Sequence, residues 1–216
     1  MAKLGLSLLL ILLSIFSLSS TVEPAFSRDS NIARRSRALA YIETACQTTR
    51  YPALCVHCLS TYIKPNMTIQ SPQQLAQVAL SASLYRALYA RAYVLKVVRE
   101  LKTLKRENQV VQDCLEQIND SVDQLSGSIK ELRRLGQESV GDDLFWHISN
   151  VETWVSTALT DASTCVDELP AGPNMSKLKA TIKGKVLNVA EVTSNALALF
   201  HKFAARYRAA SATKKP

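Results

Sequence analysis

The sequence is poor in the residues that terminate strands and build catalytic sites. It has only six glycines, seven prolines and three histidines in 216 residues, and few stretches alternate polar and apolar side chains. Sheet-rich folds are therefore disfavoured. The histidines form no cluster with metal-ligand spacing, and no serine-hydrolase, zinc-protease or glycine-rich phosphate motif occurs. We therefore expect no enzyme, no cofactor and no metal site.

An apolar run near the N-terminus predicts export. Lys3 precedes the nearly unbroken apolar segment 4–18, and Ala25-Phe26-Ser27 offers a small-x-small cleavage site. The run is about 15 residues long, which is too short to span a bilayer comfortably. We predict a signal peptide at 1–27 and a secreted, extracellular product with no membrane segment after cleavage. Nucleic acid is then not an expected partner.

Three Asn-x-Ser/Thr sequons are candidate glycosylation sites in an exported chain. They are Asn66, Asn119 and Asn174. Asn66 and Asn174 lie in loop-like sequence, whereas Asn119 falls inside a predicted helix and is therefore the weaker candidate.

Four long segments carry apolar residues at spacings of three and four, the pattern of amphipathic helices. The first segment follows Ser71-Pro72-Gln73-Gln74, which reads as an N-cap, a proline at the first helical position and a capping-box glutamine. Its expected core face is Leu75, Val78, Ala82, Tyr85, Tyr89 and Ala92, widened by Leu84, Leu88 and Leu95.

The other three segments have equally regular apolar faces. The second shows Val111, Leu115, Ile118, Val122, Leu125, Ile129 and Leu132. The third shows Leu144, Ile148, Val151, Val155, Ala158, Ala162 and Cys165. The fourth shows Leu178, Ile182, Val186, Val189, Thr193, Ala196, Phe200 and Phe203. Such faces are typical of a protein core and not of a cofactor site.

Short breaks between these segments predict how the helices are arranged. Positions 136–141 and 169–175 leave room only for tight connections, so consecutive helices should be antiparallel neighbours. We predict an all-α fold, an up-down-up-down four-helix bundle at 71–210. An N-terminal helical hairpin extension should occupy 28–70, and a disordered basic tail 211–216.

The five cysteines of an exported chain should form two bridges and leave one thiol free. Cys114 and Cys165 are equally far from the 136–141 turn, so an antiparallel pair brings them to the same height. Cys46 and Cys55 bracket the turn at Tyr51-Pro52 in the same way. Cys58 is then the free thiol, because its CxxC spacing with Cys55 lacks the βαβ context of a redox motif.

Acidic residues concentrate in one part of a basic chain. The formal net charge is +8, yet positions 107–168 contain thirteen acidic and three basic residues. Four carboxylates spaced by three and four form one stripe on the second helix: Asp113, Glu116, Asp120 and Asp123. The predicted Cys114–Cys165 bridge brings Asp167 to the same height along the helix pair as Asp113 and Glu116. Like charges at this spacing cost stability, which favours a cationic partner over the alternative, an ordinary solvated face.

Four blocks of the sequence resemble the plant invertase/pectin methylesterase inhibitor family. They are Cys46-Gln-Thr-Thr-Arg-Tyr-Pro-Ala-Leu-Cys55, Asp113-Cys114-Leu115-Glu116, Trp154 to Cys165, and Val192 to Ala198. Together they cover almost the whole mature chain in the family's order. The resemblance implies a four-helix bundle with an N-terminal helical hairpin and the bridges Cys46–Cys55 and Cys114–Cys165.

The resemblance also implies a function. Pectin methylesterase inhibitors of this family cover the esterase's substrate cleft in a 1:1 complex and so control pectin de-esterification in the plant cell wall. Acidic residues that follow the third and fourth framework cysteines line that contact, and here they are Glu116, Asp120, Asp123 and Asp167, beside Asp113. Clustered carboxylates raise one another's pKa, so we expect binding to vary with pH in the acidic range.

Three alternatives stay open, of which an enzyme, detectable by a turnover assay, has the least support in the sequence. The family's acid invertase inhibitors carry a Pro-Lys-Phe tripeptide, and here His201-Lys202-Phe203 lacks the proline. A pectin-binding cell-wall protein is the remaining alternative, with acidic pectin held by the basic segments 86–106 and 177–215.

Overall fold

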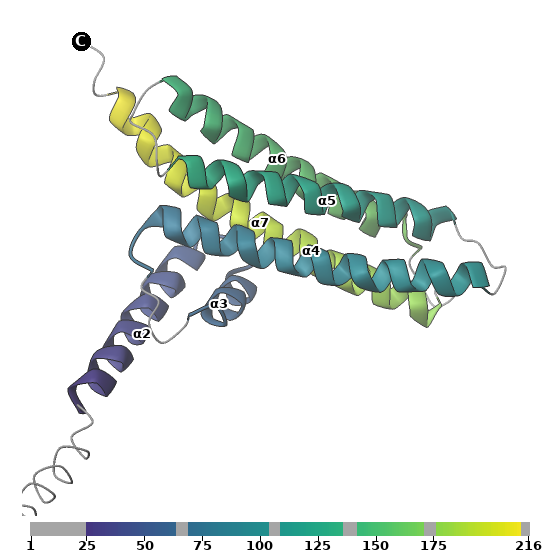
Figure 1. Cartoon of the computed structure of the whole chain (residues 1–216), viewed down its shortest axis with the longest axis horizontal. Helices are drawn as coiled ribbons and strands as arrows, with labels where there is room; N and C mark the ends of the chain where they lie inside the picture. The colour runs from purple at the N-terminus through teal and green to yellow at the C-terminus, as the bar shows by residue number, and fades with distance from the viewer. Residues whose placement is uncertain (1–24, 64–68, 104–108, 136–141, 171–175, 213–216) are drawn as a thin grey trace, which may run out of the picture.

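The computed structural model describes residues 25–63, 69–103, 109–135, 142–170 and 176–212. Within these ranges the regular secondary structure is helical throughout, which confirms the all-α fold (Figure 1). The helices are α2 (Ala25–Cys46), α3 (Pro52–Ser60), α4 (Pro72–Thr103), α5 (Gln109–Arg134), α6 (Asp142–Glu168) and α7 (Lys177–Ala212). None of the helices in the described ranges combines the length and apolar character needed to cross a bilayer.

Several predictions concern residues outside these ranges. The signal sequence up to position 24 and the sequons at Asn66 and Asn174 lie there, and they stay predictions. The division into domains also stays a prediction, although α7 continues to Ala212, two residues into the expected tail at 211–216.

Helices α4 to α7 form the bundle. The most extensive packing joins α5 to α6 and α4 to α7, and these two antiparallel pairs lie against each other (Figure 1). The apolar seams expected for α5, α6 and α7 are buried, except that Leu115 and Leu178 are half-buried. The four-helix arrangement is therefore the one that the periodicity predicts.

The expected core face of α4 is wrong in its second half. Tyr85 and Tyr89 are 60% and 57% exposed, and Leu88 and Ala92 are exposed as well. The buried stripe instead passes through small residues and valines: Ala76, Ala79, Ser83, Ala87, Ala90, Val94 and Val97. Small side chains let α4 approach its neighbours closely, and this close approach leaves the larger tyrosines on the outside.

The start of α4 is capped as predicted. The Ser71 hydroxyl accepts a hydrogen bond from the backbone N–H of Gln74 at 3.2 Å. The Gln74 side chain accepts in turn from the backbone N–H of Gln70 at 2.9 Å, one residue further back than in a standard capping box.

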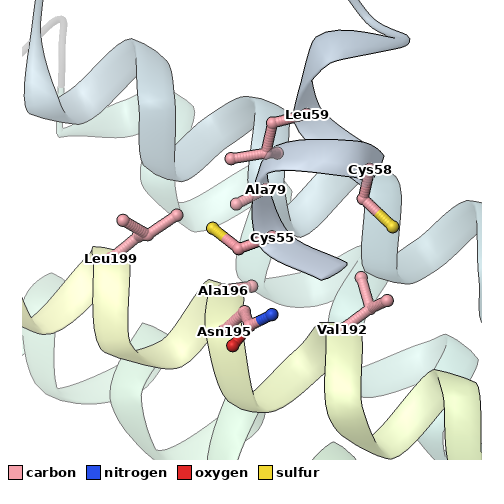
Figure 2. Close-up of a pocket in the computed structure, with 8 residues that line it drawn as sticks. All are labelled: Cys55, Cys58, Leu59, Ala79, Val192, Asn195, Ala196 and Leu199. Carbon is pink, nitrogen blue, oxygen red and sulfur yellow. The ribbon is translucent and has the colours of Figure 1, made fainter. Parts of the chain in front are cut away.

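Both predicted disulfides are present. The Cα atoms are 5.7 Å apart in Cys46–Cys55 and 4.7 Å apart in Cys114–Cys165. Cys58 is free and buried, and its sulfur lies 3.9 Å from Nη2 of Arg86. Figure 2 shows Cys55 and Cys58 on consecutive turns of α3 with their sulfur atoms pointing in different directions.

The N-terminal hairpin is fastened to the last helix. The side chain of Asn195 accepts from the backbone N–H of Tyr51 at 3.0 Å and donates to the carbonyl of Tyr51 at 2.9 Å. Lys202 donates to the carbonyl of Ala45 at 2.7 Å. Figure 2 shows Leu59 of α3 above Ala79 of α4, and Cys55 above Asn195 and Ala196 of α7. Helix α3 therefore rests on α4 and α7, while α2 projects from the bundle (Figure 1). The bridge Cys46–Cys55 then ties α2 to this fixed point.

The register between α5 and α6 is set by more than their disulfide. The buried hydroxyl of Ser121 donates to the carbonyl of Ala158 at 3.0 Å. Gly127 lets the ring of Trp154 approach closely, because a Cβ at position 127 would lie 3.2 Å from the Trp154 ring. These contacts and the bridge are spread along the pair, so a one-turn slip would break all of them.

A buried polar cluster joins the far ends of the same two helices. Glu131 is 3% exposed, and its Oε1 lies 2.6 Å from Nδ1 of His147 and accepts from Asn150 at 2.9 Å. Arg134 donates to its other oxygen at 3.2 Å. Burial alone would raise the pKa of Glu131, but the hydrogen bonds from Asn150 and His147 and the charges of His147 and Arg134 lower it overall. The carboxylate is thus held ionised inside the bundle.

The two bridges should contribute unequally to stability. They close loops of 51 and 9 residues, and the chain entropy removed from the unfolded state grows with loop length. We expect Cys114→Ser with Cys165→Ser to lower the free energy of unfolding by about 4 kcal/mol, and Cys46→Ser with Cys55→Ser by about 2.5 kcal/mol. Urea denaturation of both double variants measures the difference, and a larger loss from the shorter loop would contradict it.

Glu131→Gln should destabilise the protein in a pH-dependent way. The folded pKa lies below the unfolded one, so the carboxylate adds stability above the ordinary glutamate pKa of about 4.3 and loses it as the pH falls through the folded pKa. We expect a loss of about 2 kcal/mol at neutral pH that shrinks in acid. Chemical denaturation across this pH range measures it. The exposed Glu116→Gln on the same helix is the control, and an equal loss there would contradict the role of the cluster.

Candidate functional site

Charge is divided between the two helix pairs. Helix α6 has six acidic and no basic residues, and the acidic residues of α5 occupy most of its length while its basic residues come at its end, from Lys130 onward. Helix α4 has five basic residues and one acidic residue, and α7 has seven and one. The bundle therefore has an acidic side, α5–α6, and a basic side, α4–α7.

The predicted acidic stripe lies on the surface of the acidic side. Glu116, Asp120 and Asp123 on α5 are exposed, and Asp113 is half-buried and accepts a hydrogen bond from Gln109 at 2.7 Å. The Cys114–Cys165 bridge places the end of α6 beside the start of this stripe, and the exposed carboxylates of Asp167 and Glu168 follow it directly. We call the acidic face the set Asp113, Glu116, Asp120, Asp123, Asp161, Asp167 and Glu168.

Asp161 is the member of this face that the sequence did not single out. One of its carboxylate oxygens is buried and has no hydrogen-bond partner among the described residues. Burial raises the pKa of Asp161, and the negative charge of Asp120 across the helix pair raises it further. Asp161 lacked a sequence signal because it belongs to no acidic stripe on its own helix. Only the α5–α6 register brings it to Asp120.

A groove borders the acidic face on its α7 side. It has a volume of about 260 Å³ and lies between α6 and α7, with Arg50 and Tyr51 of the hairpin turn on its wall. Asp167 and Glu191 also line it. Asn195 fixes the backbone of Tyr51. The hairpin turn is therefore held in place at the edge of this groove, next to the acidic face.

The remaining candidate residues serve the fold. Cys58 is enclosed between α3, α4 and α7, beside a cavity of about 10 Å³, roughly the size of one water molecule. Asn119 is half-buried on α5, and the serine of its sequon, Ser121, is buried against α6. Glycosylation at Asn119 stays a prediction. Within the described ranges, no group of three or more His, Cys, Asp or Glu side chains is placed to hold a metal ion.

Sequence comparisons identify relatives along most of the chain. Residues 40–199 match the family model described as plant invertase/pectin methylesterase inhibitor. Pectinesterase inhibitor 9 of Arabidopsis thaliana is 44% identical over 197 residues, which cover 91% of this chain and 92% of that protein. Pectinesterase inhibitor 11 of Arabidopsis thaliana is 37% identical over 196 residues, 90% of this chain and 96% of that protein.

A solved structure shares the fold. The crystal structure of a mutant form of a pectin methylesterase inhibitor from Arabidopsis superimposes with a TM-score of 0.56 at 16% sequence identity. The match covers 74% of this chain and 95% of that one. At this identity the likeness is one of fold alone, and it agrees with the helical arrangement described above.

Asp161→Asn should stabilise the protein at neutral pH. The folded pKa of Asp161 is raised, so ionisation costs stability above that pKa, and the cost disappears as the pH falls below the ordinary aspartate pKa of about 3.9. The variant should therefore unfold at higher urea concentration than the wild type at pH 7, and at a similar concentration in acid. Asp123→Asn, which neutralises an exposed carboxylate, is the control; a stabilisation of Asp161→Asn that is independent of pH would refute the electrostatic cause.

Proposed function

Because this chain belongs to the plant invertase/pectin methylesterase inhibitor family, we propose that it inhibits a pectin methylesterase by laying the acidic face over the esterase's substrate cleft. The observation that carries this proposal is the collection of exposed carboxylates from two helices on one surface. A stripe on a single helix would present one row of charge. The bridged pair presents a broad surface, which is what a protein partner with a basic rim would recognise.

Rigidity supports inhibition by occlusion. A binding surface that is already ordered loses little conformational entropy when it docks, so more of the interaction energy appears as affinity. The acidic face is held by a disulfide, by the Ser121–Ala158 hydrogen bond and by the Glu131 cluster. We propose a 1:1 complex in which the bundle itself blocks pectin from the cleft, with no chemistry on either protein.

The buried state of Phe203 favours esterase over invertase inhibition. Phe203 is 2% exposed, and Lys202 is tied to the carbonyl of Ala45. The residues most similar to the invertase-inhibitor tripeptide are thus committed to the core and to the hairpin. They cannot extend into another protein's active site without unfolding the last helix.

Location and a second ligand complete the proposal. We propose export to the cell wall, because the N-terminal sequence has the layout of a signal peptide and two disulfides persist best in an oxidising compartment.

Acidic pectin is the proposed second ligand, because the basic residues of α4 and α7 lie on the side of the bundle away from the acidic face.

Charge reversal on the acidic face should weaken inhibition. We expect Glu116→Lys with Asp120→Lys to slow association with a pectin methylesterase by about tenfold or more at low salt, because the variant repels a basic rim. The association rate is measured by surface plasmon resonance. Inhibition is measured as the decrease in methanol that the esterase releases from pectin. The same variants are assayed against an acid invertase.

The matched control keeps the same change in net charge. Glu43→Lys with Glu100→Lys reverses two exposed carboxylates on α2 and α4, away from the acidic face. This control should slow association only slightly. Equal effects from the two double variants would show that total charge matters and not the acidic face, and inhibition of invertase alone would overturn the proposed target.

A further inference from the structure

A row of tyrosines lies on the outside of α4, on the basic side of the bundle. Tyr85 and Tyr89 are 60% and 57% exposed, and Tyr93, one turn further on, is half-buried. Residues four apart lie on one face of a helix, so the three rings follow one another along the surface. Tyr93 packs in part against the core, but the core does not account for Tyr85 and Tyr89, because this part of α4 packs through its small residues. Exposed tyrosine rings, apolar on the face and polar at the edge, are enriched at binding surfaces.

The ammonium group of Lys185 on α7 lies over two of these rings. Its nitrogen is 4.3 Å from the ring centroid of Tyr89 and 4.9 Å from that of Tyr93. Attraction between the cation and the two ring faces holds the charge in one place. Among the described residues no carboxylate lies within ion-pair distance of Lys185, so none of them neutralises this charge.

The surface around this lysine is open and positive. Gly184 next to it is exposed, and a Cβ placed there would have no atom of the described residues within 4 Å, so α7 is open to solvent at this position. The helices that carry the rings and the lysine hold twelve basic residues between them and two acidic ones. A negatively charged ligand is therefore attracted to this side of the bundle.

The three side chains match the chemistry of an acidic sugar polymer. A sugar ring presents C–H groups on its face, which pack on aromatic rings, and hydroxyl groups at its edge. A uronic acid residue adds a carboxylate to this. We infer that Tyr89, Tyr93 and Lys185 form a binding site for a polyuronate such as de-esterified pectin, with the sugar faces on the tyrosines and a carboxylate on Lys185. This inference rests on the proposed inhibition of an esterase in the cell wall.

The proposed site would let the inhibitor bind the product of the enzyme that it inhibits. A pectin methylesterase converts neutral methyl esters of pectin into carboxylates, so the ligand recognised by Lys185 is the product of the enzyme. The tyrosine–lysine site lies on α4 and α7, whereas the acidic face lies on α5 and α6. The protein can then hold the polymer and the esterase at the same time. It accumulates where de-esterification has already taken place.

Binding to polygalacturonate, measured without any esterase, tests this site. We expect the full chain to bind oligogalacturonate in isothermal titration and fully methyl-esterified pectin far more weakly. Tyr89→Ala and Lys185→Glu should each weaken binding about tenfold, the change in affinity that corresponds to losing one such contact. Trp146→Ala, which removes a 62% exposed aromatic residue of α6, and Lys130→Glu on α5 are the matched controls and should change affinity little.

Polyglutamate separates sugar recognition from attraction to any polyanion. It has carboxylates but no sugar rings, so Tyr89→Ala should leave its binding unchanged while weakening that of oligogalacturonate. Equal weakening of both ligands, or no effect of Tyr89→Ala on either, would overturn the site. Inhibition of esterase is measured in parallel and should be unaffected by Tyr89→Ala. If this variant loses inhibition but keeps its affinity for oligogalacturonate, the tyrosines belong to a protein interface and the inference is wrong.

Discussion

The antiparallel register of α5 and α6 is the constraint on which the rest of the molecule depends. The Cys114–Cys165 bridge sets it at one end, the Ser121–Ala158 hydrogen bond and the Gly127–Trp154 contact set it in the middle, and the Glu131 cluster sets it at the other end. The bridge, Ser121 and Glu131 are buried, where a misplaced polar group is costly, and the Gly127–Trp154 contact is half-buried. The same register gathers carboxylates that repel one another on the outside. Interior contacts therefore hold these carboxylates close together on the surface, although the repulsion between them opposes this arrangement.

The division of charge gives the bundle two different sides. An acidic surface and a basic surface on one small protein attract ligands of opposite sign without competing for the same atoms. The N-terminal hairpin adds to this arrangement. Asn195 fixes its turn and Lys202 the end of α2 against α7, beside the groove that Asp167 lines. The two proposed functions, inhibition of an esterase and binding of an acidic polymer, thus use different sides of one rigid bundle.

Where sequence reasoning succeeded, the signal came from large apolar side chains or from simple counting along antiparallel helices. The valine and isoleucine seams of α5 and α6 are buried as predicted, and both disulfides join the cysteines that lie at equal distances from their turns. It failed in the second half of α4, where the buried stripe passes through Ser83, Ala87 and Ala90 before it reaches the valines. Alanine and serine carry little hydrophobic signal, so the conspicuous tyrosines were assigned to the core, whereas they lie outside it.

The sequence by itself determined the all-α class, the helix count of the bundle, the two bridges and the acidic stripe of α5, because each follows from residue spacing along one helix or around one turn. It also identified the family through its cysteine blocks. Tertiary structure alone decided which face of α4 turns inward, that Asp161 meets Asp120, and that Lys185 rests on Tyr89 and Tyr93. These are contacts between different helices, and the rotation of each helix about its axis depends on the summed packing of all its neighbours, which no single stretch of sequence contains.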